Sequence, residues 1–162
     1  MIKFALIVTA TLITGVSIYV YQTLPSSPED ALQRFHSEKV AEDQIIDPLI
    51  LIGKPVVPLL LKEVKDRNME GRRYAIAALG HLEDQAALST LEDIFKDDSE
   101  TDYYRCDALN AIALLNPNVG LAFAKVNANS ATDCIGQLSR ALVSGELPTR
   151  RTYFQALTRQ HD

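Results

Sequence analysis

The fold of this chain is decided by the stretch Asn68-Met-Glu-Gly-Arg-Arg-Tyr-Ala-Ile-Ala-Ala-Leu-Gly80, continuing as His81-Leu-Glu-Asp-Gln-Ala-Ala-Leu-Ser-Thr-Leu-Glu-Asp-Ile-Phe-Lys-Asp97. Apolar residues recur every three or four positions on both sides of Glu83-Asp84, which is the spacing of amphipathic α-helices. Ala75, Ala78 and Gly80 are small, so we expect another helix to approach closely there, and a bulky replacement to overpack the hairpin. The stretch therefore predicts a helical hairpin.

The same pattern continues in both directions along the chain. Residues 56–66 overlay residues 87–97 at an offset of 31, and residues 75–79 overlay residues 108–112 at an offset of 33. A period of about 30 residues is typical of an α-solenoid, in which stacked hairpins share one core. Helices are predicted over residues 29–39, 44–52, 56–65, 70–82, 85–96, 102–115, 119–126, 131–143 and 149–160. The predicted core is Leu59, Leu60, Val64, Ala75, Ile76, Leu79, Leu82, Leu88, Leu91, Ile94, Phe95, Ala108, Leu109 and Ile112.

The quoted stretch resembles the HEAT-repeat proteins, and among them the short repeats of the phycobilisome-lyase type. Arg72 and Arg73 stand where this family opens its first helix, residues 75–80 match its small A-A-x-A-L-G run, and Asp84 stands where its turn caps the second helix. The resemblance covers roughly residues 44–127 and is most specific in this one repeat. It implies a short right-handed α-solenoid whose second helices line a concave surface that grips another macromolecule.

Polar residues on the second helices are the candidate partner-binding residues. They recur at spacings of three or four, which places them on a shared side of each helix. The set is Lys62, Glu63, Ser89, Glu92, Asp93 and Lys96. Residues 83–107 carry nine acidic and two basic side chains, whereas four arginines follow from residue 140 onward. We interpret this asymmetry as a docking surface for a protein or peptide partner, with simple solvation of helix faces as the alternative.

Signals for chemistry are weak. The histidines lie apart in the chain, at His36, His81 and His161, and are expected to face solvent or to lie in turns. The acidic residues 97–102 do not form a calcium loop, because Tyr103 stands where glycine is needed and Leu109 where a glutamate is needed. No phosphate-binding glycine loop or nucleophile elbow occurs.

We therefore expect a non-catalytic adaptor without a metal or cofactor. A net charge of −5 also argues against nucleic acid as its main partner. A bilin-lyase-like enzyme or enzyme subunit and a self-associating structural module are the alternative functions. At 162 residues, with 47% apolar residues and no Trp, the chain has room for one helical domain.

The uncharged N-terminal segment predicts the cellular compartment of the protein. Residues 4–21 contain no charge, and as a helix they would be about 27 Å long, enough to cross a bilayer core. Tyr19 and Tyr21 stand where an interfacial aromatic belt would lie. We predict an N-terminal transmembrane anchor in residues 1–24, a linker in residues 25–28 and a HEAT-like helical repeat domain in residues 29–162.

Charges around this segment predict its orientation. Lys3 precedes it and the acidic Glu29 and Asp30 follow, so the positive-inside rule places residues 25–162 on the outer side, which in a bacterium is the periplasm. A cleaved secretory signal is the alternative. A lipoprotein is excluded because no cysteine follows the apolar run. In the exported part, Cys106 and Cys134 form either one disulfide or two buried free thiols.

Overall fold

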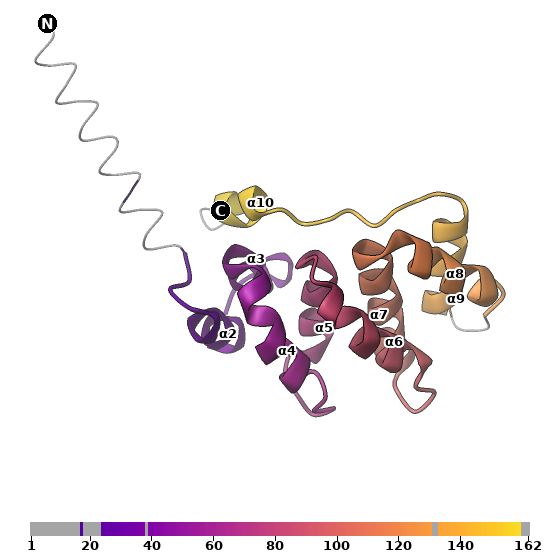
Figure 1. The fold of residues 1–162 in the computed structure, drawn as a ribbon, viewed down its shortest axis with the longest axis horizontal. Helices are drawn as coiled ribbons and strands as arrows, with labels where there is room; N and C mark the ends of the chain where they lie inside the picture. The colour runs from indigo at the N-terminus through magenta and orange to yellow at the C-terminus, as the bar shows by residue number, and fades with distance from the viewer. Residues whose placement is uncertain (1–16, 18–23, 38, 131–132, 160–162) are drawn as a thin grey trace, which may run out of the picture.

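The computed structural model describes residues 17, 24–37, 39–130 and 133–159. These residues form helices and turns without any strand, so the prediction of an all-α fold is confirmed. The α-helices are α2 (Pro28–Ser37), α3 (Asp47–Ile52), α4 (Val57–Glu63), α5 (Arg72–His81), α6 (Leu88–Lys96), α7 (Asp102–Leu115), α8 (Pro117–Asn127), α9 (Asp133–Val143) and α10 (Tyr153–Arg159). Short 3-10 turns lie at Glu42–Gln44, Lys54–Val56 and Gln85–Ala87. Figure 1 shows the helices stacked side by side from α2 to α9, an arrangement consistent with a helical solenoid.

Local sequence signals set the helix ends. The hydroxyl of Ser27 accepts a hydrogen bond from the amide of Asp30 (3.1 Å), which starts α2. The Asp84 carboxylate accepts one from the amide of Ala86 (3.0 Å), which starts the second helix of the central hairpin through a 3-10 turn. Asn116 caps α8 in the same way. The 3-10 turns Lys54–Val56 and Gln85–Ala87 lead into α4 and α6, whereas α8 begins directly as an α-helix at Pro117.

Close helix contacts form around α7. A Cβ atom added to Gly80 would lie 2.6 Å from the Cα of Ala111, and one added to Gly120 would lie 2.5 Å from the Cα of Ala113. Glycine is therefore required where α5 and α8 each cross α7. This confirms the predicted close approach at Gly80.

One continuous apolar cluster runs through the stack, from Phe35 on α2 to Ala156 on α10. Of the predicted core residues, all are buried except Leu59 and Leu88, which are half-buried. Helical periodicity alone therefore predicts buried and half-buried positions correctly.

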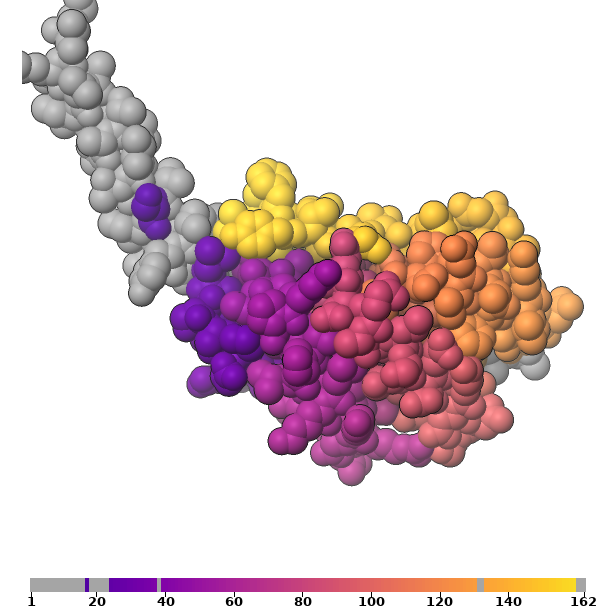
Figure 2. Space-filling model, viewed as in Figure 1, coloured from indigo at the N-terminus to yellow at the C-terminus, as the bar shows by residue number. Residues whose placement is uncertain are grey.

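The C-terminal segment departs from the predicted pairing. The sequence predicts that residues 131–143 and 149–160 form a last hairpin. Instead, the chain leaves α9, runs back along the stack, and packs α10 against α3 near the other end (Figure 1). Figure 2 shows this segment lying along one edge of the molecule. We call residues 144–159 the C-terminal strap.

The predicted N-terminal anchor, residues 4–21, lies outside the described residues apart from Ser17. In the described part of the chain, no single helix has the length and apolar character to cross a membrane. One bent pair, Glu42–Ile52 with Lys54–Glu63, meets the length and composition criteria together, at an angle of 97°. In the predicted linker, Pro25 is buried and the amide of Ser26 donates to the Asp30 carboxylate (2.8 Å).

Candidate partner-binding cleft

A cleft of about 390 Å³ lies between the end of α4, the start of α5 and the exposed side of α6. Successive second helices therefore border it, as expected for the binding surface of stacked hairpins. Its lining consists of Val64, Lys65, Arg67, Arg72, Ser89, Thr90, Asp93, Ile94, Asp97 and Glu100.

The back wall of the cleft is a buried ion pair. Arg72, only 3% exposed, donates two hydrogen bonds to the Glu100 carboxylate (2.9 and 2.6 Å) and one to the carbonyl of Val64 (2.7 Å). Its guanidinium also lies 5.0 Å from the ring centroid of Tyr104. These contacts satisfy the buried charge, as burial of an arginine requires. Arg72 thus joins consecutive repeats and is not free to bind a ligand.

The next repeat uses the equivalent arginine in the same way. Arg105, which overlays Arg72, donates to the carbonyl of Phe95 (3.0 Å), just as Arg72 donates to the carbonyl of Val64. In both cases, an arginine near the start of a first helix donates a hydrogen bond to a backbone carbonyl at the C-terminal end of the preceding second helix. Such carbonyls have no partner within their own helix. The repeated arginine therefore has a structural role.

The rim of the cleft is polar. Arg67 forms an ion pair with Asp97, whose carboxylate also accepts hydrogen bonds from the amide and hydroxyl of Ser99 (2.9 and 2.6 Å). The hydrogen bonds from Ser99, assisted by the charge of Arg67, lower the pKa of Asp97. Lys65 and Asp93, by contrast, have no ion-pair partner among the described residues. The rim therefore offers one free cation and one free anion.

Two of the six predicted partner-binding residues line this cleft, namely Ser89 and Asp93. Glu92 and Lys96 pair with each other (2.6 Å), and the Lys96 ammonium lies 5.1 Å from the ring centroid of Phe123 on α8. One helical position thus separates Asp93, in the cleft, from Glu92, which faces the neighbouring hairpin.

The remaining two predicted residues lie elsewhere. Glu63 pairs with His36 (2.8 Å) at the edge of a separate hollow of about 380 Å³. Lys62 is exposed and lines neither cavity. The six residues therefore do not line a single cavity. Lys65, Thr90 and Asp97 also line the cleft, although the sequence pattern does not predict them there; of these three, Asp97 lies in the acidic run 97–102.

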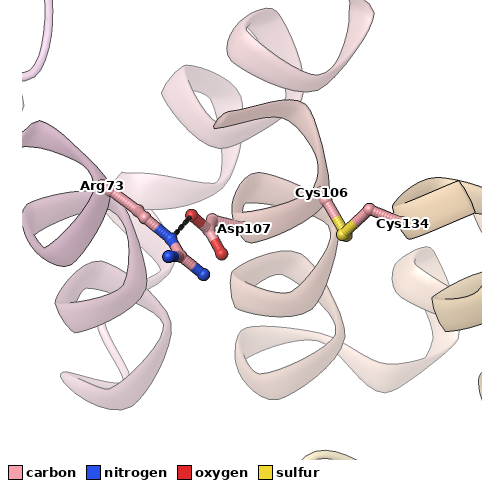
Figure 3. The surroundings of a disulfide bond; sticks show 4 residues. All are labelled: Arg73, Cys106, Asp107 and Cys134. Atoms are coloured by element: carbon pink, nitrogen blue, oxygen red, sulfur yellow. Dashed lines mark hydrogen bonds and ion pairs between the residues drawn. A yellow bond between two sulfur atoms is a disulfide. The ribbon is translucent and has the colours of Figure 1, made fainter. Parts of the chain in front are cut away.

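The two cysteines form a disulfide between α7 and α9, with their Cα atoms 5.9 Å apart (Figure 3). This is the first of the two alternatives left open by the sequence. One residue further along α7, the Asp107 carboxylate accepts a hydrogen bond from Arg73 on α5 (2.7 Å). Helix α7 is thus linked to α5 by the ion pair between Arg73 and Asp107, and to α9 by the disulfide.

The C-terminal strap is held by polar contacts. The amide of Arg151 donates to Nδ1 of His81 (2.8 Å), and the Arg151 guanidinium pairs with the buried Asp47 on α3 (2.9 Å). Arg150 pairs with Glu83 (2.6 Å) and also donates to a backbone carbonyl at the end of α7. His81, which we expected in solvent or in a turn, is thus half-buried beneath the strap at the end of α5.

Burial and the neighbouring charges change the ionisation of these groups. Desolvation, reinforced by the positive charges of Arg151 and Arg150, lowers the pKa of His81 to about 4. Desolvation raises the pKa of Asp47 in spite of its pairing with Arg151. The strap therefore packs on a neutral imidazole at neutral pH.

Among the described residues, no group of three or more His, Cys, Asp or Glu side chains lies together in a way that could hold a metal ion. Comparison of the chain with models of protein families, with curated proteins and with solved structures finds no match. Function is therefore inferred from the residues and their geometry.

Proposed function

We propose that this chain is a short, right-handed, HEAT-like α-solenoid that serves as a membrane-anchored adaptor in the cell envelope. It binds an extended segment of a protein or peptide partner in the cleft between α4 and α6, and it does so without catalysis. The observation that carries this proposal is the pairing pattern of the cleft. The charged groups of its back wall, Arg72 and Glu100, pair with each other, whereas Lys65 and Asp93 on the rim have no ion-pair partner in the part of the chain that the structure describes.

The lining of the cleft suits a peptide. The hydroxyls of Ser89 and Thr90 can each donate and accept a hydrogen bond, as the alternating groups of an extended backbone require. The apolar side chains of Val64 and Ile94 form part of the lining. Lys65 and Asp93 would meet opposite charges on the partner, which fixes its register and direction more than its affinity.

Two features support the envelope as the compartment. The disulfide between Cys106 and Cys134 suits an oxidising environment, such as the outer side of a bacterial inner membrane. The uncharged residues 4–21 are long enough for an anchor, and Lys3 before them favours a cytoplasmic N-terminus.

One residue inside the cleft, on α6, and one exposed residue outside it, on α4, provide a matched test of the cleft. In membranes from cells with a C-terminally tagged chain, a photo-crosslinking amino acid at Ser89 should capture one dominant envelope protein. The same probe at Lys62, which is exposed but outside the cleft, should not. Capture of only cytoplasmic proteins, or of equal products from both positions, would contradict the proposal.

Charge reversal then tests the rim. Asp93→Lys should abolish the Ser89 crosslink, because it replaces the free anion by a cation. Glu92→Lys alters charge by the same amount one residue away and should leave the crosslink intact, because Glu92 faces Lys96 and α8. Equal loss in both variants would mean that general electrostatics, and not this cleft, attracts the partner.

A further inference from the structure

Two aromatic side chains on α10 are exposed, and neither makes a ring contact or an ion pair with another described residue. Phe154 is 71% exposed and the adjacent Tyr153 is 47% exposed. On the same helix, Ala156 is buried and Leu157 is half-buried against the core. At 100° per residue, Phe154 points roughly 160° away from the buried Ala156 and about 60° from the half-buried Leu157, so its ring lies outside the buried side of the helix. The helix is thus apolar on both faces, although only one face is covered.

The place of α10 in the fold is the second observation. The helix packs on α3, and α3 also packs on α2, so α10 lies at the end of the stack where the described chain begins (Figure 1). This end is firmly attached, since Leu24 packs against the core and Pro25 is buried. The strap therefore places Tyr153 and Phe154 at the end of the stack that contains Leu24.

The length of the connection limits how far this end can be from a membrane. The uncharged run ends at Tyr21, and three residues, even if fully extended, lead to Leu24 over about 10 Å. A chain anchored through residues 4–21 therefore holds this end of the domain at the bilayer surface. At that distance, an exposed aromatic pair meets the headgroup region at high effective concentration.

We infer that Tyr153 and Phe154 on α10 form a membrane-contact surface that lies in the lipid headgroup region beside the anchor. Aromatic side chains are favoured at this depth, where an apolar ring can leave water while a polar tip, such as the Tyr153 hydroxyl, stays hydrated. This inference rests on the anchor in the proposed function. It adds that the solenoid is oriented on the membrane, with α2, α3 and α10 toward the lipid.

Charge contributes little to this contact. Arg150 and Arg151 pair with Glu83 and Asp47, and Arg159 lies 3.6 Å from a carboxylate oxygen of Asp43. The arginines of the strap are therefore neutralised by the domain itself. We expect the contact to depend on the aromatic rings and to be similar on neutral and anionic lipid.

The absence of tryptophan from the sequence allows a direct test. The full-length Phe154→Trp variant is reconstituted into phosphatidylcholine vesicles, with and without bromine on the acyl chains near the headgroups. We expect the emission to shift to the blue and to fall by about half in brominated vesicles, as it would for a ring buried 5 to 10 Å into the interface. Vesicles with added phosphatidylglycerol should give the same result.

Tyr103→Trp is the matched control. Tyr103 is 68% exposed at the start of α7, away from α10, and should report water in both kinds of vesicle. Equal quenching at both positions, or no quenching of the Phe154→Trp probe, would overturn the inference. A blue shift that grows with protein density and is insensitive to bromine would mean that a second copy covers the aromatic pair.

The anchor is tested separately in the same samples. Chain that stays with the vesicles after carbonate washing, but whose Phe154→Trp probe is not quenched, contradicts the membrane-contact surface alone. Chain that is washed off contradicts both the anchor and the contact. Binding of a partner in the cleft is unaffected by either result.

Discussion

The centre of the stack and the C-terminal strap are held to the molecule by different forces. Around α7, apolar side chains such as Leu79, Leu109 and Ile112 are fully buried, and glycine permits near-contact of the backbones. The strap buries little apolar surface, chiefly Ala156, and is fixed by three arginines and a histidine. The centre is therefore held mainly by apolar packing, and the strap mainly by ion pairs and hydrogen bonds.

This difference predicts two kinds of behaviour. Salt does not screen the burial of apolar surface, whereas an exposed ion pair such as Arg150–Glu83 contributes about 0 to 1 kcal/mol and is screened; the largely buried Arg151–Asp47 pair is screened less. Segments with few buried apolar contacts also open locally before the rest of a protein unfolds. We expect the strap to detach while the stack remains folded.

The largest effect should come from truncation in the centre. Leu109→Ala removes a fully buried side chain from α7 and should lower the free energy of unfolding by about 2 to 5 kcal/mol, because a cavity remains. Leu157→Ala, the matched change in the strap, should cost about 1 kcal/mol or less, because Leu157 is half-exposed and α10 can detach. Urea unfolding followed by circular dichroism measures both. Equal losses would mean that strap and stack unfold as one unit.

The disulfide should have the next largest effect. It joins residues 28 positions apart, and a loop of this size stabilises the folded state by roughly 3.5 kcal/mol. Because it ties α9 to the centre, its loss should release α9 and the strap before α5 to α8. Urea unfolding of the Cys106→Ala, Cys134→Ala double variant, compared with the oxidised chain, checks this. Unchanged stability would show that packing alone holds α9.

Overpacking should follow in size. Gly80→Ala places a methyl group 2.6 Å from the Cα of Ala111, so α5 and α7 must separate, at a cost of about 1 to 3 kcal/mol. Ala122→Val on the exposed side of α8 adds apolar bulk without this contact and should change stability little. The thermal midpoint of each variant is the measurement. A stable Gly80→Ala variant would show that the helices can shift apart freely.

The same contrast explains what could be predicted from the sequence. The centre follows from local rules, since periodicity identifies Leu79 and Ile112 as core and small size marks Gly80 as a crossing point. The strap does not, because its contact between Arg151 and Asp47 joins residues 104 positions apart without any local signal. The sequence groups Asp93 with Glu92, but of the two only Asp93 lines the cleft, since spacing gives a side of a helix but not its rotation about the axis.

The smallest predicted effect is that acid weakens the strap. Neutral His81 accepts the hydrogen bond from the Arg151 amide, whereas the protonated ring cannot accept it and repels Arg150 and Arg151. Because the pKa of His81 is lowered to about 4, its contribution to stability is complete above about pH 6.5 and is lost as the pH falls toward 4. The raised pKa of Asp47 acts in the opposite direction, since the folded state binds that proton more readily.

Detachment limits the size of this effect. Once the strap has detached from the stack, the His81 imidazole is hydrated and its protonation has no further effect. Acid should therefore lower the free energy of unfolding by no more than about 1 kcal/mol. The backbone amide of Arg151 reports the hydrogen bond directly, and its NMR shift should titrate with a midpoint below the ordinary histidine value of about 6.5. In His81→Gln this titration should disappear, while the effect of Asp47 remains. A midpoint near 6.5 in the unmodified chain would mean that the imidazole is hydrated and that charge pairs alone hold the strap.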